Sequence, residues 1–162
     1  MLKVADILAE SVVDGVGIRT VVFLQGCPRH CKGCHNEALL PFSGGTAYTA
    51  TDLVAAITTK LTPLHRGVTF SGGDPLAQAE GLATVIALLR QKAPRLTMWV
   101  YTGYTYEEVK TWPVLEQIDV LVDGPFILEQ RDLSLPFRGS GNQRIIDVPA
   151  SLQAGQVVAW TK

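Results

Sequence analysis

Three cysteines lie close together in this chain of 162 residues, and the chain has no others. They stand at positions 27, 31 and 34 in the sequence GCPRHCKGC, which begins at position 26. Three thiolates on one short loop can wrap a single metal centre. An iron–sulfur cube normally takes four cysteine ligands, so Cys27, Cys31 and Cys34 would leave one iron without a protein ligand. An open position of that kind is where a substrate or cofactor can bind a metal.

Zinc and redox-sensing thiols are the two alternatives for the same cysteines. A zinc site would need His30, inside the loop, or His35, whose place beside Cys34 makes joint ligation of one ion awkward. Structural zinc sites also usually pair two C-x2-C knuckles. Three thiols cannot form a complete set of internal disulfides, and clustered thiols bind metal more often than they form cross-links.

The segments that must position this loop are short apolar runs rich in β-branched residues. They cover residues 20–24, 68–70, 97–101 and 118–122, and a further strand is expected over residues 3–12. Near-continuous apolar runs are typical of parallel strands covered on both faces. So few strands cannot close an eight-stranded barrel, which takes about 250 residues. We therefore predict an α/β fold, an open partial β/α barrel with a mostly parallel sheet.

Helical patterns fill the intervals between these runs. Residues 49–61 and 76–91 carry apolar stripes with helical spacing. Asp74 is a suitable N-cap for the second of them. A shorter helix is expected to begin at Thr105, where Glu108 completes a capping box. Alternating strands and helices imply right-handed crossovers, which place the C-terminal ends of the parallel strands along one edge.

Glycine-bearing turns follow each of the four central strands. The turns read Gly26-Cys27, then Ser71-Gly72-Gly73-Asp74, then Thr102-Gly103-Tyr104, then Asp123-Gly124. Parallel α/β sheets bind their ligands at the C-terminal ends of the strands. We therefore expect the cysteine loop and the three later turns to converge on one rim.

Composition and charge argue against several classes of protein. The formal net charge of -1 and the pI near 6.3 argue against a large nucleic-acid-binding face. No apolar run approaches the roughly 20 residues that a membrane helix needs. The N-terminus carries Asp6, Glu10 and Asp14 and lacks the features of a signal peptide, so we expect a cytoplasmic protein with no membrane partner. The length predicts a single domain over residues 1–162.

Six motifs, in order over residues 14–143, together resemble the radical S-adenosylmethionine superfamily. Besides the cysteine loop they are DGVGIR at 14, SGGDPL at 71, WVYTGY at 99, VDGPF at 122 and RGSGNQ at 138. More narrowly, the chain resembles the glycyl-radical enzyme activases that serve anaerobic ribonucleoside-triphosphate reductases. Gly33 stands where many members of the superfamily have an aromatic residue, and Val16 stands where relatives often have proline.

The resemblance implies a defined chemistry. Cys27, Cys31 and Cys34 would hold a 4Fe–4S cluster whose fourth iron chelates S-adenosyl-L-methionine. An electron, from reduced flavodoxin or a similar donor, would split the sulfonium and release a 5′-deoxyadenosyl radical. That radical would take a hydrogen from a glycine of the partner, the large subunit of an anaerobic glycyl-radical reductase. Two alternatives remain: an activase of another glycyl-radical enzyme such as pyruvate formate-lyase, or a non-catalytic metal-binding module.

The resemblance also implies residues that bind the cofactor. The backbone of Gly72 and Gly73 would approach the methionine moiety, where a Cβ would obstruct it. Gly33, Cys34 and His35 would line the adenosine side.

Other residues near the expected rim have two interpretations each. Asp74 is either an N-cap or a ligand contact, and Asp123 is either a contact to the ribose or amino group or part of a turn. Arg19 either pairs with a carboxylate of the ligand or forms a surface or structural ion pair. The polar residues 138–144 read as a loop that either covers the site or docks the partner, and His65 reads as a surface residue ahead of a strand.

Overall fold

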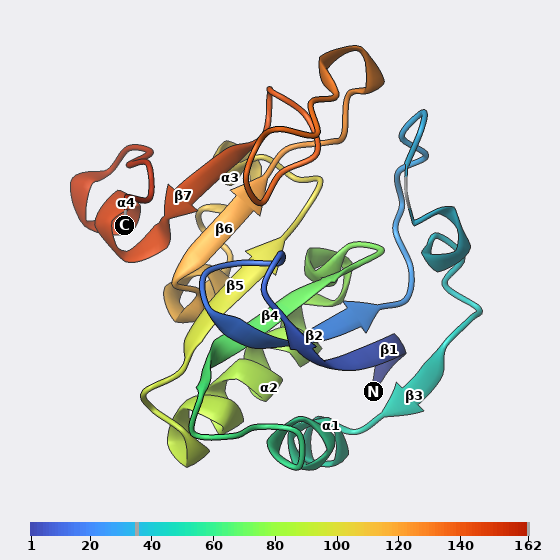
Figure 1. The fold of residues 1–162 in the computed structure, drawn as a ribbon, viewed down its shortest axis with the longest axis vertical. Coiled ribbons are helices and arrows are strands. Elements are labelled where there is room, and N and C mark those ends of the chain that lie inside the picture. Colours follow the sequence, from blue (N-terminus) through green and yellow to red (C-terminus); the bar gives the residue numbers. More distant parts are fainter. Residues whose placement is uncertain (35, 162) are drawn as a thin grey trace.

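A single seven-stranded sheet organises the computed structural model, which describes residues 1–34 and 36–161 (Figure 1). The order across the sheet is β3-β1-β2-β4-β5-β6-β7. The strands are β1 (Leu2–Ser11), β2 (Ile18–Leu24), β3 (Thr46–Tyr48), β4 (His65–Gly72), β5 (Thr97–Tyr101), β6 (Val120–Asp123) and β7 (Arg144–Asp147). The four central strands, β2, β4, β5 and β6, run parallel, while β1, β3 and β7 pair antiparallel at the two sides.

The predicted open, mostly parallel α/β sheet is confirmed, and all four predicted central strands are present. The sequence did not indicate β3 or β7, which are short edge strands of three and four residues. Residue 144, read as the end of a loop, begins β7 and pairs with Asp123. A short strand carries too few apolar residues to show a period, so only its pairing defines it.

Helices occupy the crossovers between the parallel strands, and two further helices follow β6 and β7. The α-helices are α1 (Ala50–Thr58), α2 (Ala79–Lys92), α3 (Tyr106–Val109) and α4 (Val148–Ala154). The 3-10 helices are η1 (Glu37–Leu39), η2 (Pro75–Gln78), η3 (Pro113–Gln117) and η4 (Leu128–Gln130). Thr49 caps α1 by accepting a hydrogen bond from the Asp52 backbone, and the capping box of Thr105 and Glu108 begins α3. The helix expected over residues 76–91 divides into η2 and α2, because the chain first makes a tight turn after Asp74.

The two faces of the sheet are covered differently, since alternate side chains of each strand point to opposite faces. One face packs Val22, Val68, Phe70 and Val100 against the buried residues of the helices in the main core. The other face carries a small second cluster around Trp99, Val120 and Val122. Helices α1 and α2 lie together on the covered face, and α4 lies beyond β7 (Figure 1). No helix among the described residues is long and apolar enough to cross a membrane.

Two sequence expectations about individual side chains are wrong. His65 is buried, not exposed: its Nδ1 accepts a hydrogen bond from the Thr62 backbone, so its Nε2 carries the proton and donates to the Ala9 carbonyl. Arg19 is also buried and makes no ion pair with a carboxylate among the described residues. Its guanidinium donates to Thr69 and Thr97, among other oxygens, and burial lowers its pKa to about 10. Both side chains therefore bind strands together.

Candidate functional site

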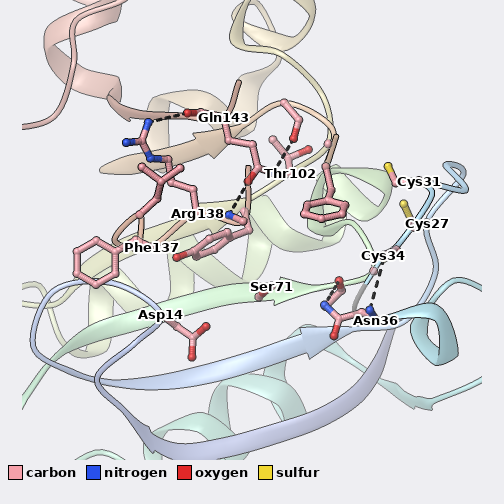
Figure 2. A pocket seen from close by; sticks show the side chains of 18 of the residues that line it. Asp14, Cys27, Cys31, Cys34, Asn36, Ser71, Thr102, Phe137, Arg138 and Gln143 are labelled. Carbon is pink, nitrogen blue, oxygen red and sulfur yellow. Dashed lines mark hydrogen bonds between the residues drawn. The ribbon is translucent and has the colours of Figure 1, made fainter. Parts of the chain in front are cut away.

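A cavity of about 670 Å³ opens at the C-terminal ends of the parallel strands. All three cysteines line it, together with Ser71, Gly72 and Gly73 from the end of β4. Figure 2 shows Cys27 and Cys31 on one side of this cavity and Asp14 and Phe137 on the other. The expected convergence of the cysteine loop with the later turns is therefore present, because the right-handed crossovers bring these ends to one rim.

The cysteine loop, residues 27–34, is attached to the body of the protein at both ends. The Cys27 backbone donates a hydrogen bond of 3.0 Å to the Leu40 carbonyl. At the other end, the Asn36 side chain donates to the Gly72 carbonyl at 3.3 Å, and the Asn36 backbone donates to the Cys34 sulfur at 3.4 Å. These bonds fix one end of the loop to Leu40 and the other to the end of β4. Asn36 did not stand out in the sequence.

The donor set fits an iron–sulfur cluster. All three thiols are free and partly buried, and all three line the same cavity. Burial raises the pKa of the Cys27 thiol, so binding a metal there releases a proton. Among the described residues, no three His, Cys, Asp or Glu side chains are grouped as ligands for a single metal ion. Because Cys27, Cys31 and Cys34 line one cavity, with room for a second ligand, they are the residues that would hold the cluster.

The paired glycines after β4 meet the base of the cysteine loop. Gly72 has a φ of +104°, which favours glycine. A Cβ on Gly73 would lie 2.4 Å from the Gly26 carbonyl oxygen and 2.7 Å from that of Leu39. Two chain segments therefore pass each other here with no room for a side chain, and the backbone of both glycines stays open to the cavity.

Asp74 lies behind the cavity wall, outside the set of residues that line it. Its buried carboxylate accepts hydrogen bonds from the Leu76 backbone at 3.0 Å, the Thr102 hydroxyl at 2.8 Å and the Gly103 backbone at 3.0 Å. Burial raises the pKa of Asp74, and these donors oppose that rise. Its N-cap role is present, and the carboxylate also joins the ends of β4 and β5.

Asp123 is likewise buried and outside the residues that line the cavity. It accepts a hydrogen bond of 2.7 Å from the Tyr106 backbone and pairs with Arg144. The next residue, Gly124, does line the cavity.

Of Gly33 and His35, which flank Cys34, the structure describes only Gly33. Gly33 has a φ of +76° and lines a groove on the outer side of the cysteine loop, together with Cys27, Cys31 and Phe42. His35 lies outside the described residues. Cys27 and Cys31 line both the inner cavity and this outer groove, so the loop forms the wall between them.

The opposite wall of the cavity comes from a segment that the sequence indicated only in part. This wall is lined by Leu133 and Phe137, which the sequence did not indicate, and by Arg138 and Gln143 from the polar segment 138–144. The Arg138 side chain donates to the Gln143 carbonyl at 2.9 Å, while its Nε is buried with no hydrogen-bond partner among the described residues. The segment thus folds over the cavity, which favours the covering role over docking alone.

Tyr101 also lines the cavity, at the end of β5. Burial, with the nearby Asp14 carboxylate, raises the pKa of its phenol, so the side chain is neutral at physiological pH. In the sequence, Tyr101 was marked by the WVYTGY motif and by its place at the end of the strand expected over residues 97–101. Tyr104, three residues later, lies outside the cavity lining and packs on Trp112.

Comparison with known proteins gives a consistent result. A family model described as a 4Fe-4S single cluster domain matches residues 13–146. An anaerobic ribonucleoside-triphosphate reductase-activating protein from Vibrio cholerae is 40% identical over 141 residues, covering 83% of this chain and 90% of that protein. The protein of the same name from Haemophilus influenzae is 40% identical over 140 residues, with 83% and 90% covered.

Among solved structures, QueE from Escherichia coli is similar with a TM-score of 0.48 at 20% identity. The match covers 64% of this chain and 53% of that one.

Proposed function

We propose that this chain, which belongs to the family of anaerobic ribonucleoside-triphosphate reductase-activating proteins, forms a glycyl radical on such a reductase. The chain is a radical S-adenosylmethionine enzyme whose cofactors are a 4Fe–4S cluster and S-adenosyl-L-methionine. The observation that carries the proposal is the meeting of three free thiols and a Gly72-Gly73 backbone around one cavity at the ends of the parallel strands. We also propose that residues 1–162 form one domain, because the strands of the described residues all belong to one sheet.

The chain's own residues would bind the two cofactors, orient them and shield the site from water. Cys27, Cys31 and Cys34 would hold the cluster, which when bound supplies the electron for reductive cleavage of S-adenosyl-L-methionine. The open backbone of Gly72 and Gly73 would accept the methionine moiety closely. The segment that carries Phe137 and Arg138 would cover the opposite side and exclude water from a reactive radical.

The remaining predicted site residues divide into two groups. Cys34 and His35 would lie toward the adenosine, whereas Gly33, predicted with them, lines the outer groove and not the cavity and would shape the loop beside Cys34. Asp74 and Asp123 would act indirectly, without touching the ligand. Their carboxylates accept backbone hydrogen bonds near the ends of the parallel strands, and so fix the rim on which the ligand rests.

The partner is the reductase, and the electron donor would be reduced flavodoxin or a similar protein. We place the donor at the outer groove, because Cys27 and Cys31 line it from the side opposite the cavity. Lys32, Glu37 and the exposed ring of Phe42 also line this groove. Of these, Lys32 offers a basic contact and Phe42 an apolar contact for a small acidic redox protein. A reduced thiol environment in the cytoplasm suits the free cysteines.

The test mixes the anaerobically reconstituted protein with S-adenosyl-L-methionine, a reductant and the large reductase. The expected result is a glycyl-radical doublet in the EPR spectrum of the reductase, absent when its radical glycine is replaced by alanine. As a control for the activating protein, the Arg131→Gln variant, altered at an exposed arginine outside the cavity, should give the same doublet as wild type. A doublet only with pyruvate formate-lyase would make the reductase assignment wrong. A colourless, air-stable protein with stoichiometric zinc would refute the enzyme.

A further inference from the structure

Arg29 lies inside the cysteine loop, between Cys27 and Cys31, and its side chain points back to the body of the protein. Its Nη1 lies 3.2 Å from the Asp74 carboxylate, which is only 1% exposed. Its guanidinium carbon lies 4.2 Å from the centre of the Tyr104 ring. The planar cation thus has a charged partner and an aromatic face at the same time, an arrangement that suits arginine better than lysine.

Gly103 leaves the space that this side chain fills. A Cβ at that position would lie 2.9 Å from the Arg29 Cδ and 3.1 Å from its Nη1. The arginine therefore lies directly against the backbone that follows β5, beside Tyr104. Its three neighbours all belong to the turns that follow β4 and β5, so one side chain joins the loop to two strand ends.

No other side chain of residues 27–34 makes an ion pair or a ring contact in the described part of the chain. The backbone bonds of the loop hold its two ends, at Cys27 and near Asn36. Between them, the segment from Cys27 to Cys31 depends on Arg29 for its place against the cavity. The Asp74 carboxylate that receives Arg29 is itself fixed by three other donors, so it is a rigid anchor.

We infer that Arg29 is a positioning residue for the cluster, which holds the Cys27–Cys31 half of the loop in place before iron arrives. A preformed loop spends less free energy on ordering when it binds, so it retains the cluster more tightly. Outer residues that orient ligands typically contribute 10- to 100-fold in metal affinity. The inference rests on the proposed cluster site, but it concerns how the site is built and not what the radical does.

The experiment compares wild type with Arg29→Met, Arg29→Lys and Arg131→Met. Arg131→Met is the matched control, because it makes the same substitution at an exposed arginine outside the cysteine loop and the cavity. The first measurement is the rate at which a chelator removes iron from the reconstituted protein. The second is hydrogen exchange of residues 27–31 in the metal-free chain, which needs no cluster and no activity.

For Arg29→Met we expect iron loss about tenfold faster or more, and faster exchange in residues 27–31. Arg29→Lys should recover part of both effects, since it keeps the charge opposite Asp74 and loses the flat stacking surface. Arg131→Met should stay within about twofold of wild type. Equal rates for Arg29→Met and Arg131→Met would overturn the inference, as would unchanged exchange in the metal-free loop.

A second pair of variants keeps the test decisive if Arg29→Met does not fold. Tyr104→Leu removes the ring under the guanidinium, whereas Tyr104→Phe keeps it. Faster iron loss for Tyr104→Leu alone supports the inference, and equal iron loss for both overturns it. Failure of the proposed function would give a different result: a wild-type protein that retains its cluster but forms no glycyl radical on the reductase.

Discussion

Arg144 Nη2 lies 2.6 Å from the Asp123 carboxylate, although the two residues are 21 positions apart in the chain. A second hydrogen bond, from Arg144 Nε to the other carboxylate oxygen, measures 3.1 Å. Asp123 also accepts from the Tyr106 backbone at the start of α3. This two-pronged pair therefore fastens β7 and α3 to the end of β6, beside the glycine that lines the cavity.

Replacement of Asp123 by Asn should reduce stability. The buried carboxylate would lose its charge while the Arg144 pair is broken, at a cost of about 1–3 kcal/mol in the free energy of unfolding. Glu107→Gln is the control, because that carboxylate also pairs with Arg144 but is largely exposed and should cost about 0–1 kcal/mol. Urea unfolding measures both. Equal losses for the two variants would contradict the assigned role of Asp123.

Glu107 gives the protein a mild acid dependence. Hydrogen bonds from Arg144 hold the pKa of Glu107 below its usual range. Because the folded state binds this proton less readily than the unfolded state, the stabilisation is present at neutral pH and fades as the pH falls through the lowered pKa. The difference in melting temperature between wild type and Glu107→Gln should therefore shrink as the pH falls from 6 toward that pKa. A constant difference would show that Arg144 does not recognise the charged form.

Replacement of Gly73 by Ala should disturb the base of the cysteine loop. The added Cβ would clash with the backbone oxygens of Gly26 and Leu39, which cannot rotate away, at a cost of about 1–3 kcal/mol. Gly141→Ala is the control, since its nearest atoms lie 3.7 Å or more away. We expect weaker binding of S-adenosyl-L-methionine by Gly73→Ala in an equilibrium binding assay. Gly141→Ala should match wild type.

Replacement of any one of Cys27, Cys31 or Cys34 by alanine should abolish both the cluster and the cleavage of S-adenosyl-L-methionine. Three ligands already leave one iron open, and two cannot retain a cube. Iron and sulfide analysis with the 5′-deoxyadenosine yield measures this loss, and circular dichroism checks that the fold persists. A variant with full cleavage would remove that cysteine from the ligand set.

Charge reversal at Lys32 should slow electron delivery. Lys32→Glu places a negative charge in the outer groove, so the KM for an acidic electron donor should rise by several-fold at low salt and less at high salt. Lys92→Glu, at the exposed end of α2, is the control. Stopped-flow reduction of the cluster at a series of donor concentrations compares the two variants. A salt-independent effect, or an equal effect at Lys92, would argue against the groove as the donor's docking face.

Much of the frame was predictable because it depends on local patterns. The four parallel strands are continuous apolar runs, and the helix starts at Thr49 and Thr105 carry capping residues that act within one turn. The strand β7 could not be predicted, since its pairing with β6 joins residues that are distant in sequence. The burial of His65 was not predicted for the same reason, because its partner Ala9 lies 56 positions away in the sequence.

The amino-acid sequence by itself determined the chemistry available to this protein: three thiols on one loop, glycines at the turns, and the order of strands and helices that brings them to one edge. Only the tertiary structure decided what each charged residue near that edge does. Asp74, Asp123 and Arg19 were open candidates for the ligand, and each is committed to other parts of the chain. The physical reason is that a side chain's role depends on the partners that surround it once it is buried, and those partners come from strands far apart in sequence.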